Sequence, residues 1–177
     1  MPFALFCYNC NLMKIITNIR LLLIALWLGA AIFFGFSLAK SAFEILPSRE
    51  MAGSVVSANL SVLNYAGLII GVIMLLSSFI SAKGVVGWIE RVLLLIFTIA
   101  CAIGQFVILY QISHIRAEVG RPIEELSTSE PLRIAFDSLH QYSIWVSVTA
   151  MIVALVSFFL ISKTPKAQQI GHLTDLG

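Results

Sequence analysis

Long apolar stretches alternate with short polar segments along the chain. Four stretches carry no Asp, Glu, Lys or Arg and contain 19, 32, 22 and 22 residues, at positions 21–39, 51–82, 92–113 and 141–162. Roughly 20 helical residues, at ~1.5 Å each, cross a hydrocarbon core about 30 Å thick. Each stretch therefore predicts one transmembrane helix, and we place the spans at about residues 20–39, 60–82, 92–113 and 140–162.

The segments between these stretches are too short to fold by themselves. The longest, residues 114–139, has 26 residues, fewer than the ~40 below which small domains need staples to fold. Residues 83–91 predict a tight hairpin, which makes the second and third helices antiparallel neighbours. The sequence thus predicts an all-α membrane protein, a four-helix transmembrane bundle with up-down-up-down topology and short loops.

The four-span domain, residues 19–162, is flanked by two shorter segments. Residues 1–18 form an N-terminal segment in which Met13 is an alternative start, and residues 163–177 form a polar tail. The stretch after Arg20 also resembles a signal peptide, but the apolar part of a signal peptide has about 7–15 residues. Its 19 residues therefore favour a retained span. With the N-terminus inside the cell, inner segments carry six Lys and Arg and outer segments five, which favours this orientation in the cell membrane.

Composition agrees with a membrane protein and excludes other classes. Apolar residues make up 59% of the chain and charged residues 11%, against about 45–50% and about 25% in globular proteins. The mean hydropathy is +0.98. These values exclude a disordered chain and an ordinary cytosolic enzyme. The net charge of +2 is too small to indicate a nucleic-acid partner.

Small residues at helical spacing mark the faces on which the helices are expected to pack. The second span contains a GxxxG pair, Gly67 and Gly71. Small side chains let transmembrane helices approach closely. The predicted packing residues are Gly29, Gly67, Gly71, Gly104, Ser143 and Ser147. We expect them to pack within one chain rather than between two copies, although a homo-oligomer stays open as an alternative.

Charges are predicted to lie at the ends of the spans and not inside them. We place Arg20 at the start of the first span, and Glu90 in the hairpin before the third. Ionisable side chains deep in a membrane commonly serve ion or proton pathways. Their predicted absence there argues against a proton relay or an ion-coupled pump. Asn64 and Gln105, polar residues within spans, are expected to bond neighbouring helices.

Two histidines and two carboxylates lie where the third helix ends and the fourth begins. His114 and Glu118 are four residues apart. Asp137 and His140 are three apart, so each pair shares a helix face. Imidazole and carboxylate are acceptable ligands for zinc, iron or copper. Charged residues at helix ends also commonly pair or extend to the headgroups. We therefore expect no cofactor and no catalytic residue, with a metal ion or haem at these four residues as the alternative.

Several segments resemble a known membrane-protein family. They are residues 26–36 (LWLGAAIFFGF), 43–53 (FEILPSREMAG), 115–120 (IRAEVG) and 139–143 (LHQYS). In this order they are similar to the transmembrane protein 205-like family, which includes domain of unknown function 4149. The resemblance covers roughly residues 19–162, and Lys40 departs from the proline expected after the first helix. It implies a four-span membrane protein without an established biochemical role. A more distant similarity to copper-resistance D-like membrane proteins favours the metal alternative.

Together these features predict a non-enzymatic, multi-pass integral membrane protein. The first hypothesis is a packing or interaction module, or one that supports movement or tolerance of a small solute. Its expected partners are the lipid bilayer and, as an alternative, a second copy of the chain, but no nucleic acid. The second hypothesis is a metal- or haem-handling membrane protein. The sequence does not identify the solute or the partner.

Overall fold

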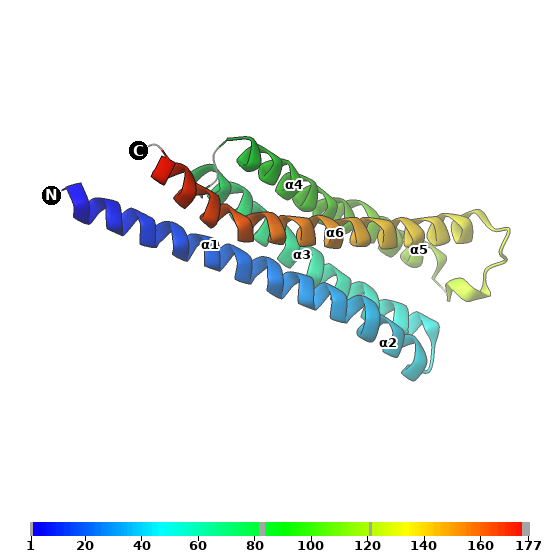
Figure 1. Ribbon diagram of the computed structural model, residues 1–177. Coiled ribbons are helices and arrows are strands. Elements are labelled where there is room, and N and C mark those ends of the chain that lie inside the picture. Colours follow the sequence, from blue (N-terminus) through cyan, green and yellow to red (C-terminus); the bar gives the residue numbers. More distant parts are fainter. Residues whose placement is uncertain (1, 82–83, 121, 175–177) are drawn as a thin grey trace.

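The protein, described by a computed structural model, is a bundle of long antiparallel helices. The backbone is described for residues 2–81, 84–120 and 122–174, and side chains for 12–80, 84–120, 122–123 and 125–163. The long helices are α1 (Pro2–Phe33), α3 (Arg49–Ser81), α4 (Gly84–Ile103) and α6 (Pro131–Thr174). Each runs opposite to the long helix before it (Figure 1).

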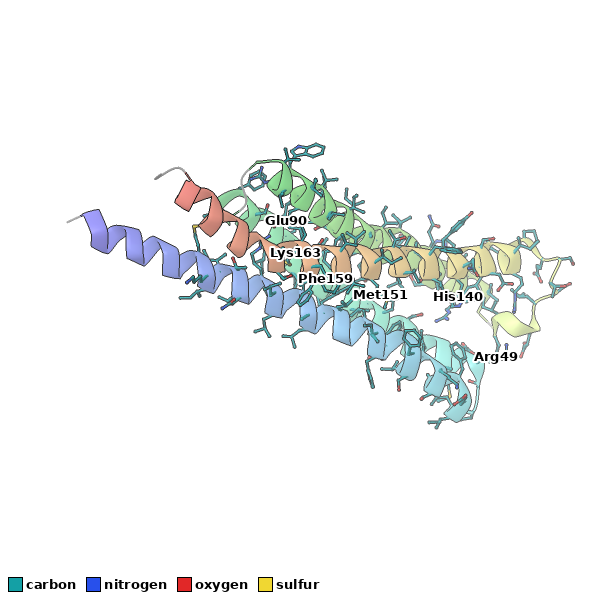
Figure 2. The ribbon with its side chains drawn as sticks, viewed as in Figure 1. Arg49, Glu90, His140, Met151, Phe159 and Lys163 are labelled. Atoms are coloured by element: carbon teal, nitrogen blue, oxygen red, sulfur yellow. The ribbon has the colours of Figure 1, made fainter. Side chains whose placement is uncertain are left out.

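Short π-helical segments continue two of the long helices without breaking them. η1 (Phe34–Leu38) leads from α1 into α2 (Ala39–Ile45), and η2 (Gly104–Leu109) leads from α4 into α5 (Tyr110–Val119). A 3₁₀ turn, η3 (Ile123–Glu125), precedes α6. Glu90 and Lys163 lie toward one end of the bundle, and His140 toward the other (Figure 2). We name these the Glu90 end and the His140 end.

Within the described residues, four helical stretches are long and apolar enough to cross a membrane. They are Leu12–Ile45, Arg49–Ile80, Gly84–Val119 and Pro131–Lys163. This confirms the predicted all-α, four-helix membrane bundle. The stretches have 32–36 residues, or about 50 Å at ~1.5 Å per residue, so they are longer than the predicted spans. The predicted hairpin is correspondingly shorter, because α4 already begins at Gly84.

Local sequence explains where the helices begin and end. At the start of α3, the backbone N–H of Met51 donates to Ser48 Oγ at 3.2 Å, as a capping serine does. At the end of α5, Gly120 has a φ of +63° and its N–H donates to Arg116 O at 3.2 Å. This left-handed conformation suits glycine. Gly84 has a φ of +70°, so it turns the chain from α3 into α4.

Aromatic and aliphatic side chains fill the centre of the bundle. Fully buried members come from all four long helices and include Ile24, Met74, Phe97 and Ala154. Trp27 packs edge-on against Phe97, with ring centroids 4.7 Å apart. The Trp27 Nε1–H also donates to Leu63 O at 3.0 Å. Trp27 therefore ties α1 to both α3 and α4.

Two of the predicted packing glycines allow helices to touch within the chain. A methyl group at Gly67 would lie 2.6 Å from Cys101 Sγ and 2.7 Å from Trp27 Nε1. At Gly104 it would lie 2.9 Å from Asn64 Nδ2. The Trp27 indole is rigid, so a side chain at Gly67 would push α1 away from α3, whereas at Gly104 the Asn64 amide would have to move.

Of the other predicted packing residues, three lie inside the bundle and one lies on its outer surface. Gly71 lies directly against Thr98, and Ser143 is buried while Ser147 is half-buried. Gly29, by contrast, lies on the outer surface, and no described atom would lie within 4 Å of a methyl group there. The face of α1 that carries Gly29 therefore points away from the bundle.

Candidate functional site

Arg20 and Glu90 are charged residues buried inside the bundle. Arg20 is 3% exposed and Glu90 is 1% exposed. The Arg20 Nη2 donates to Glu90 Oε1, forming an ion pair that joins α1 to α4. Isolated charges are costly to bury, and pairing offsets part of that cost. These two charges therefore face the interior of the bundle and not the headgroups or solvent.

The helical repeat explains why these two charges meet. Arg20 lies one turn before Ile24 on α1, and Glu90 lies one turn before Leu94 on α4. Ile24 and Leu94 both belong to the central core. Residues four apart share a helix face, and α1 and α4 run in the same direction. Both charges are therefore displaced from the core by one turn toward the Glu90 end.

The other two long helices each carry a buried serine on the Glu90 side of the core. Ser78 lies one turn after Met74 on α3, and Ser157 follows Ala154 on α6. Both serines are 0% exposed. Because α3 and α6 run opposite to α1 and α4, their later residues lie nearer to the Glu90 end. We name these buried polar residues on the Glu90 side of the core the polar layer, although they do not all lie at one height: Arg20, Ser78, Glu90 and Ser157.

Hydrogen bonding in the polar layer is incomplete. Ser78 Oγ donates to Leu75 O at 2.7 Å. Arg20 Nε and Ser157 Oγ are buried and have no hydrogen-bond partner among the described residues. At the edge of the layer, Arg91 Nη2 donates to Ser78 O at 3.4 Å. With Arg91 included, the layer carries a net positive charge.

Two exposed aromatic side chains on one helical stretch are spaced as expected for the two membrane boundaries. Trp88 and Tyr110 are both exposed and lie on one continuous helical stretch. Trp and Tyr favour the membrane–water interface. Their separation of 22 positions corresponds to about 33 Å, close to the ~30 Å hydrocarbon thickness. If Trp88 marks a boundary, we expect Glu90, two positions after it, to lie close to that boundary.

A second group of polar side chains lies in the middle of the bundle, at η2. Asn64 packs against the backbone of Gly104, and Gln105 Oε1 is buried without a hydrogen-bond partner among the described residues. Short π-helical segments within α-helices are frequent at functional sites. The bundle interior is therefore polar at two levels and not only at its Glu90 end.

The four predicted metal ligands lie toward the His140 end without forming one group. His114 Nδ1 and Glu118 Oε2 are 3.9 Å apart on the surface. Asp137 instead pairs with Arg133, whose Nε lies 3.1 Å from Asp137 Oδ2, and His140 is exposed. Across the part of the chain that the structure describes, no three His, Cys, Asp or Glu are placed to hold a metal ion. Metal or haem binding stays a prediction.

An open groove of about 430 Å³ lies between α5 and α6 beside His114. Tyr110 and Tyr142 form part of its lining, and both are exposed. Because interfacial tyrosines mark the level of the lipid headgroups, lipid is the expected occupant of the groove. Among the described residues, the groove lining that includes His114 contains no Asp, Glu or Cys.

Arg20 and Glu90 could have been recognised from the sequence. Each of the two charges borders an uncharged stretch, yet apolar residues also occur on its other side. Residues 12–19 include four apolar aliphatic positions before Arg20, and residues 85–89 are apolar before Glu90, apart from Gly87. Apolar residues beyond a charge indicate that the helix continues past it, so the charge can face the bundle interior. Ser157 carried no comparable signal, because single serines are common in transmembrane helices.

One comparison with known proteins identifies a family. No curated protein and no solved structure matches the chain. The family described as "Domain of unknown function (DUF4149)" matches residues 22–121. The matched region begins two positions after Arg20, contains Glu90 and ends before α6. Since it covers more than half of the sequence, the chain belongs to the DUF4149 family.

Proposed function

We propose that the protein is a non-enzymatic, four-span membrane protein that supports the movement or tolerance of a small polar solute. The observation that carries this proposal is the buried Arg20–Glu90 pair within the polar layer. Ionisable groups inside membrane bundles are rare and are commonly part of a binding site or a pathway. We expect the Arg20–Glu90 pair to lie near one boundary, where a solute from that face would first meet the bundle.

The incomplete hydrogen bonding favours this role over packing alone. A buried polar group without a partner costs about 1–3 kcal/mol, and a layer that served only packing would gain by completing its bonds. Arg20 Nε, Ser157 Oγ and Gln105 Oε1 all lack partners among the described residues. These atoms are spread along the interior of the bundle, which would let a small polar molecule contact them one after another.

We also infer a finer kinship with the transmembrane protein 205-like family. The segments at residues 26–36, 43–53, 115–120 and 139–143 support it. This kinship implies the four-span architecture and adds no activity. The metal- or haem-handling alternative gains no support from the placement of its four candidate ligands, so we do not pursue it.

The proposal is tested by solute permeation into liposomes that contain the purified protein. Stopped-flow light scattering would follow the entry of glycerol, urea and formate. We expect faster entry of at least one solute than in protein-free liposomes, and loss of that gain in a double variant with Arg20→Met and Glu90→Leu. An exposed serine on α6, changed by Ser162→Ala, provides the control. Equal rates with and without protein for all three solutes would contradict the proposal.

A further inference from the structure

The His140 end of the bundle holds a second, smaller apolar core. Its buried members are Ile115, Ile123 and Leu126, and partly buried side chains of α5 and α6 pack around them. They belong to α5, to η3 and the segment after it, and to the first turns of α6. We name α5, η3 and the first turns of α6 the lid. Because this core is separate from the central one, the lid is held together by its own contacts.

The lid meets the helices of the first half, α2 and α3, along a weakly packed boundary. α5 packs against η2 and α6, and α2 packs against η1 and α3. Among the described residues, no comparable packing joins α5 to α2 or to α3, and Figure 1 shows α2 and α5 apart at this end. Nearer the centre, by contrast, Gly67 lies against Cys101 and Gly71 against Thr98, so α3 and α4 are in direct contact.

The Arg116 side chain of the lid reaches across this boundary to α3. Its Nη1 lies 3.5 Å from Ser57 Oγ, and its Nη2 would lie 2.6 Å from a methyl group at Gly53. Gly53 therefore leaves the space that the guanidinium fills. A hydrogen bond of this length is weak. The guanidinium also lies over the Phe136 ring, 5.5 Å from its centroid, and this contact keeps Arg116 on the lid if the lid leaves α3.

The π-helical segment η2 lies where a hinge would be needed. It joins α4, which packs closely on α3, to α5, which does not. Such segments interrupt the regular helical hydrogen bonding and are common at kinks and functional sites. η1 and η2 begin at Phe34 and Gly104, each fourteen positions after its member of the Arg20–Glu90 pair. In membrane transporters, interrupted helices at corresponding positions of two halves point to the functional region.

We propose that the lid is a gate at the His140 end, which swings away from α3 about η2, and that Arg116 is the latch that holds it closed. Gly53, Ser57, Leu60 and Asn64 follow one another on one face of α3, and Leu60 and Asn64 are buried. Opening uncovers this face from the His140 end toward Asn64, which packs against Gly104 at the hinge. The inference stands on packing alone and does not depend on the proposed solute role.

The test is a measurement of spin-label distances in the full chain, reconstituted in lipid nanodiscs. The labels are attached at Phe43→Cys on α2 and Ala117→Cys on α5, both exposed, after the three native cysteines have been replaced by alanine. A bend of about 20° moves the far end of α5, about 15 Å from η2, by about 5 Å. We therefore expect one main distance and a minor population about 5 Å longer. In Arg116→Gln the longer distance should become the main one.

Two controls separate release of the latch from general loosening. Arg133→Gln is the matched variant, because the partners of Arg133, Asp137 and the carbonyl oxygen of Ile123, both lie within the lid. It should leave the distances unchanged. A second pair of labels, attached at Ile15→Cys and Val85→Cys at the Glu90 end, should give the same distance with and without Arg116→Gln.

Should Arg116→Gln not fold, Gly53→Leu still decides, since it keeps the arginine and fills the space of its guanidinium. The longer distance should again increase. The inference is overturned if the wild type shows a single distance, or if neither variant changes the distribution. It is also overturned if Arg133→Gln, or the labels at the Glu90 end, shift by as much. Because no solute is present, a failure of permeation into liposomes would remove the proposed function and leave this inference standing.

Discussion

Replacing Glu90 by Gln tests whether the Arg20–Glu90 pair is as desolvated as its burial indicates. The change removes the negative charge and leaves the Arg20 guanidinium 3% exposed beside a neutral amide. Breaking a buried pair by removing one partner costs about 3–5 kcal/mol. The oxygen of the introduced amide still accepts a hydrogen bond worth ~1 kcal/mol. We therefore expect the free energy of unfolding to fall by about 2–4 kcal/mol.

The measurement is reversible unfolding in mixed micelles with increasing sodium dodecyl sulfate, read out by helical circular dichroism. A double variant with Arg20→Met and Glu90→Leu replaces both charges by apolar side chains, and such replacements of buried pairs are often neutral. It should therefore be within ~1 kcal/mol of the wild type, which gives a coupling energy of about 2 kcal/mol or more in the mutant cycle. Glu118→Gln, which breaks a surface pair, should cost at most ~0.5 kcal/mol. A loss below ~1 kcal/mol in Glu90→Gln, with additive effects in the double variant, would refute burial of the pair.

Three further changes test the packing. Gly67→Leu places a side chain against the Trp27 indole and should destabilise the bundle by at least 1–3 kcal/mol, as overpacking does. Gly29→Leu, on the outer surface, should change stability by less than ~0.5 kcal/mol, and equal losses in micelle unfolding would contradict the assigned packing. Trp27→Phe removes the donor to Leu63 O and should cost ~1 kcal/mol, visible as a lower melting temperature in detergent. Gly120→Ala forces a β-carbon into a φ of +63° and should cost about 1–2 kcal/mol; an unchanged midpoint would show that the turn relaxes.

The architecture could be predicted because the lipid environment requires long apolar helices. The four uncharged stretches fixed the number of helices, and the GxxxG spacing of Gly67 and Gly71 indicated a face that packs within the chain. Helix lengths were underestimated, because charges served as boundaries. Glu90 lies in the second turn of α4, so this charge does not bound the helix, and a left-handed glycine, Gly84, makes the turn before it.

The polar layer could be predicted only in part, because it depends on contacts between distant segments. Arg20 and Glu90 carried a local signal in their apolar flanks, yet which charge faces which depends on how α1 packs against α4. Local spacing was misleading at the other end. Asp137 shares a helix face with His140. Its ion-pair partner, however, is Arg133, which lies one turn earlier on the same helix. A shared face indicates proximity along one helix and says nothing about a second helix.

The distance in sequence between Arg20 and Glu90 also bears on how the protein is made. Arg20 is synthesised 70 residues before its partner, which corresponds to about 4–14 s at 5–20 residues per second. During that interval α1 carries a charge whose partner does not yet exist, and the charge is disfavoured inside lipid. We therefore expect α1 to pack in its final position only after α4 has been made, since Arg20 has no buried carboxylate to pair with before then. A chain that stops before Glu90 should leave Arg20 unpaired and α1 loosely held.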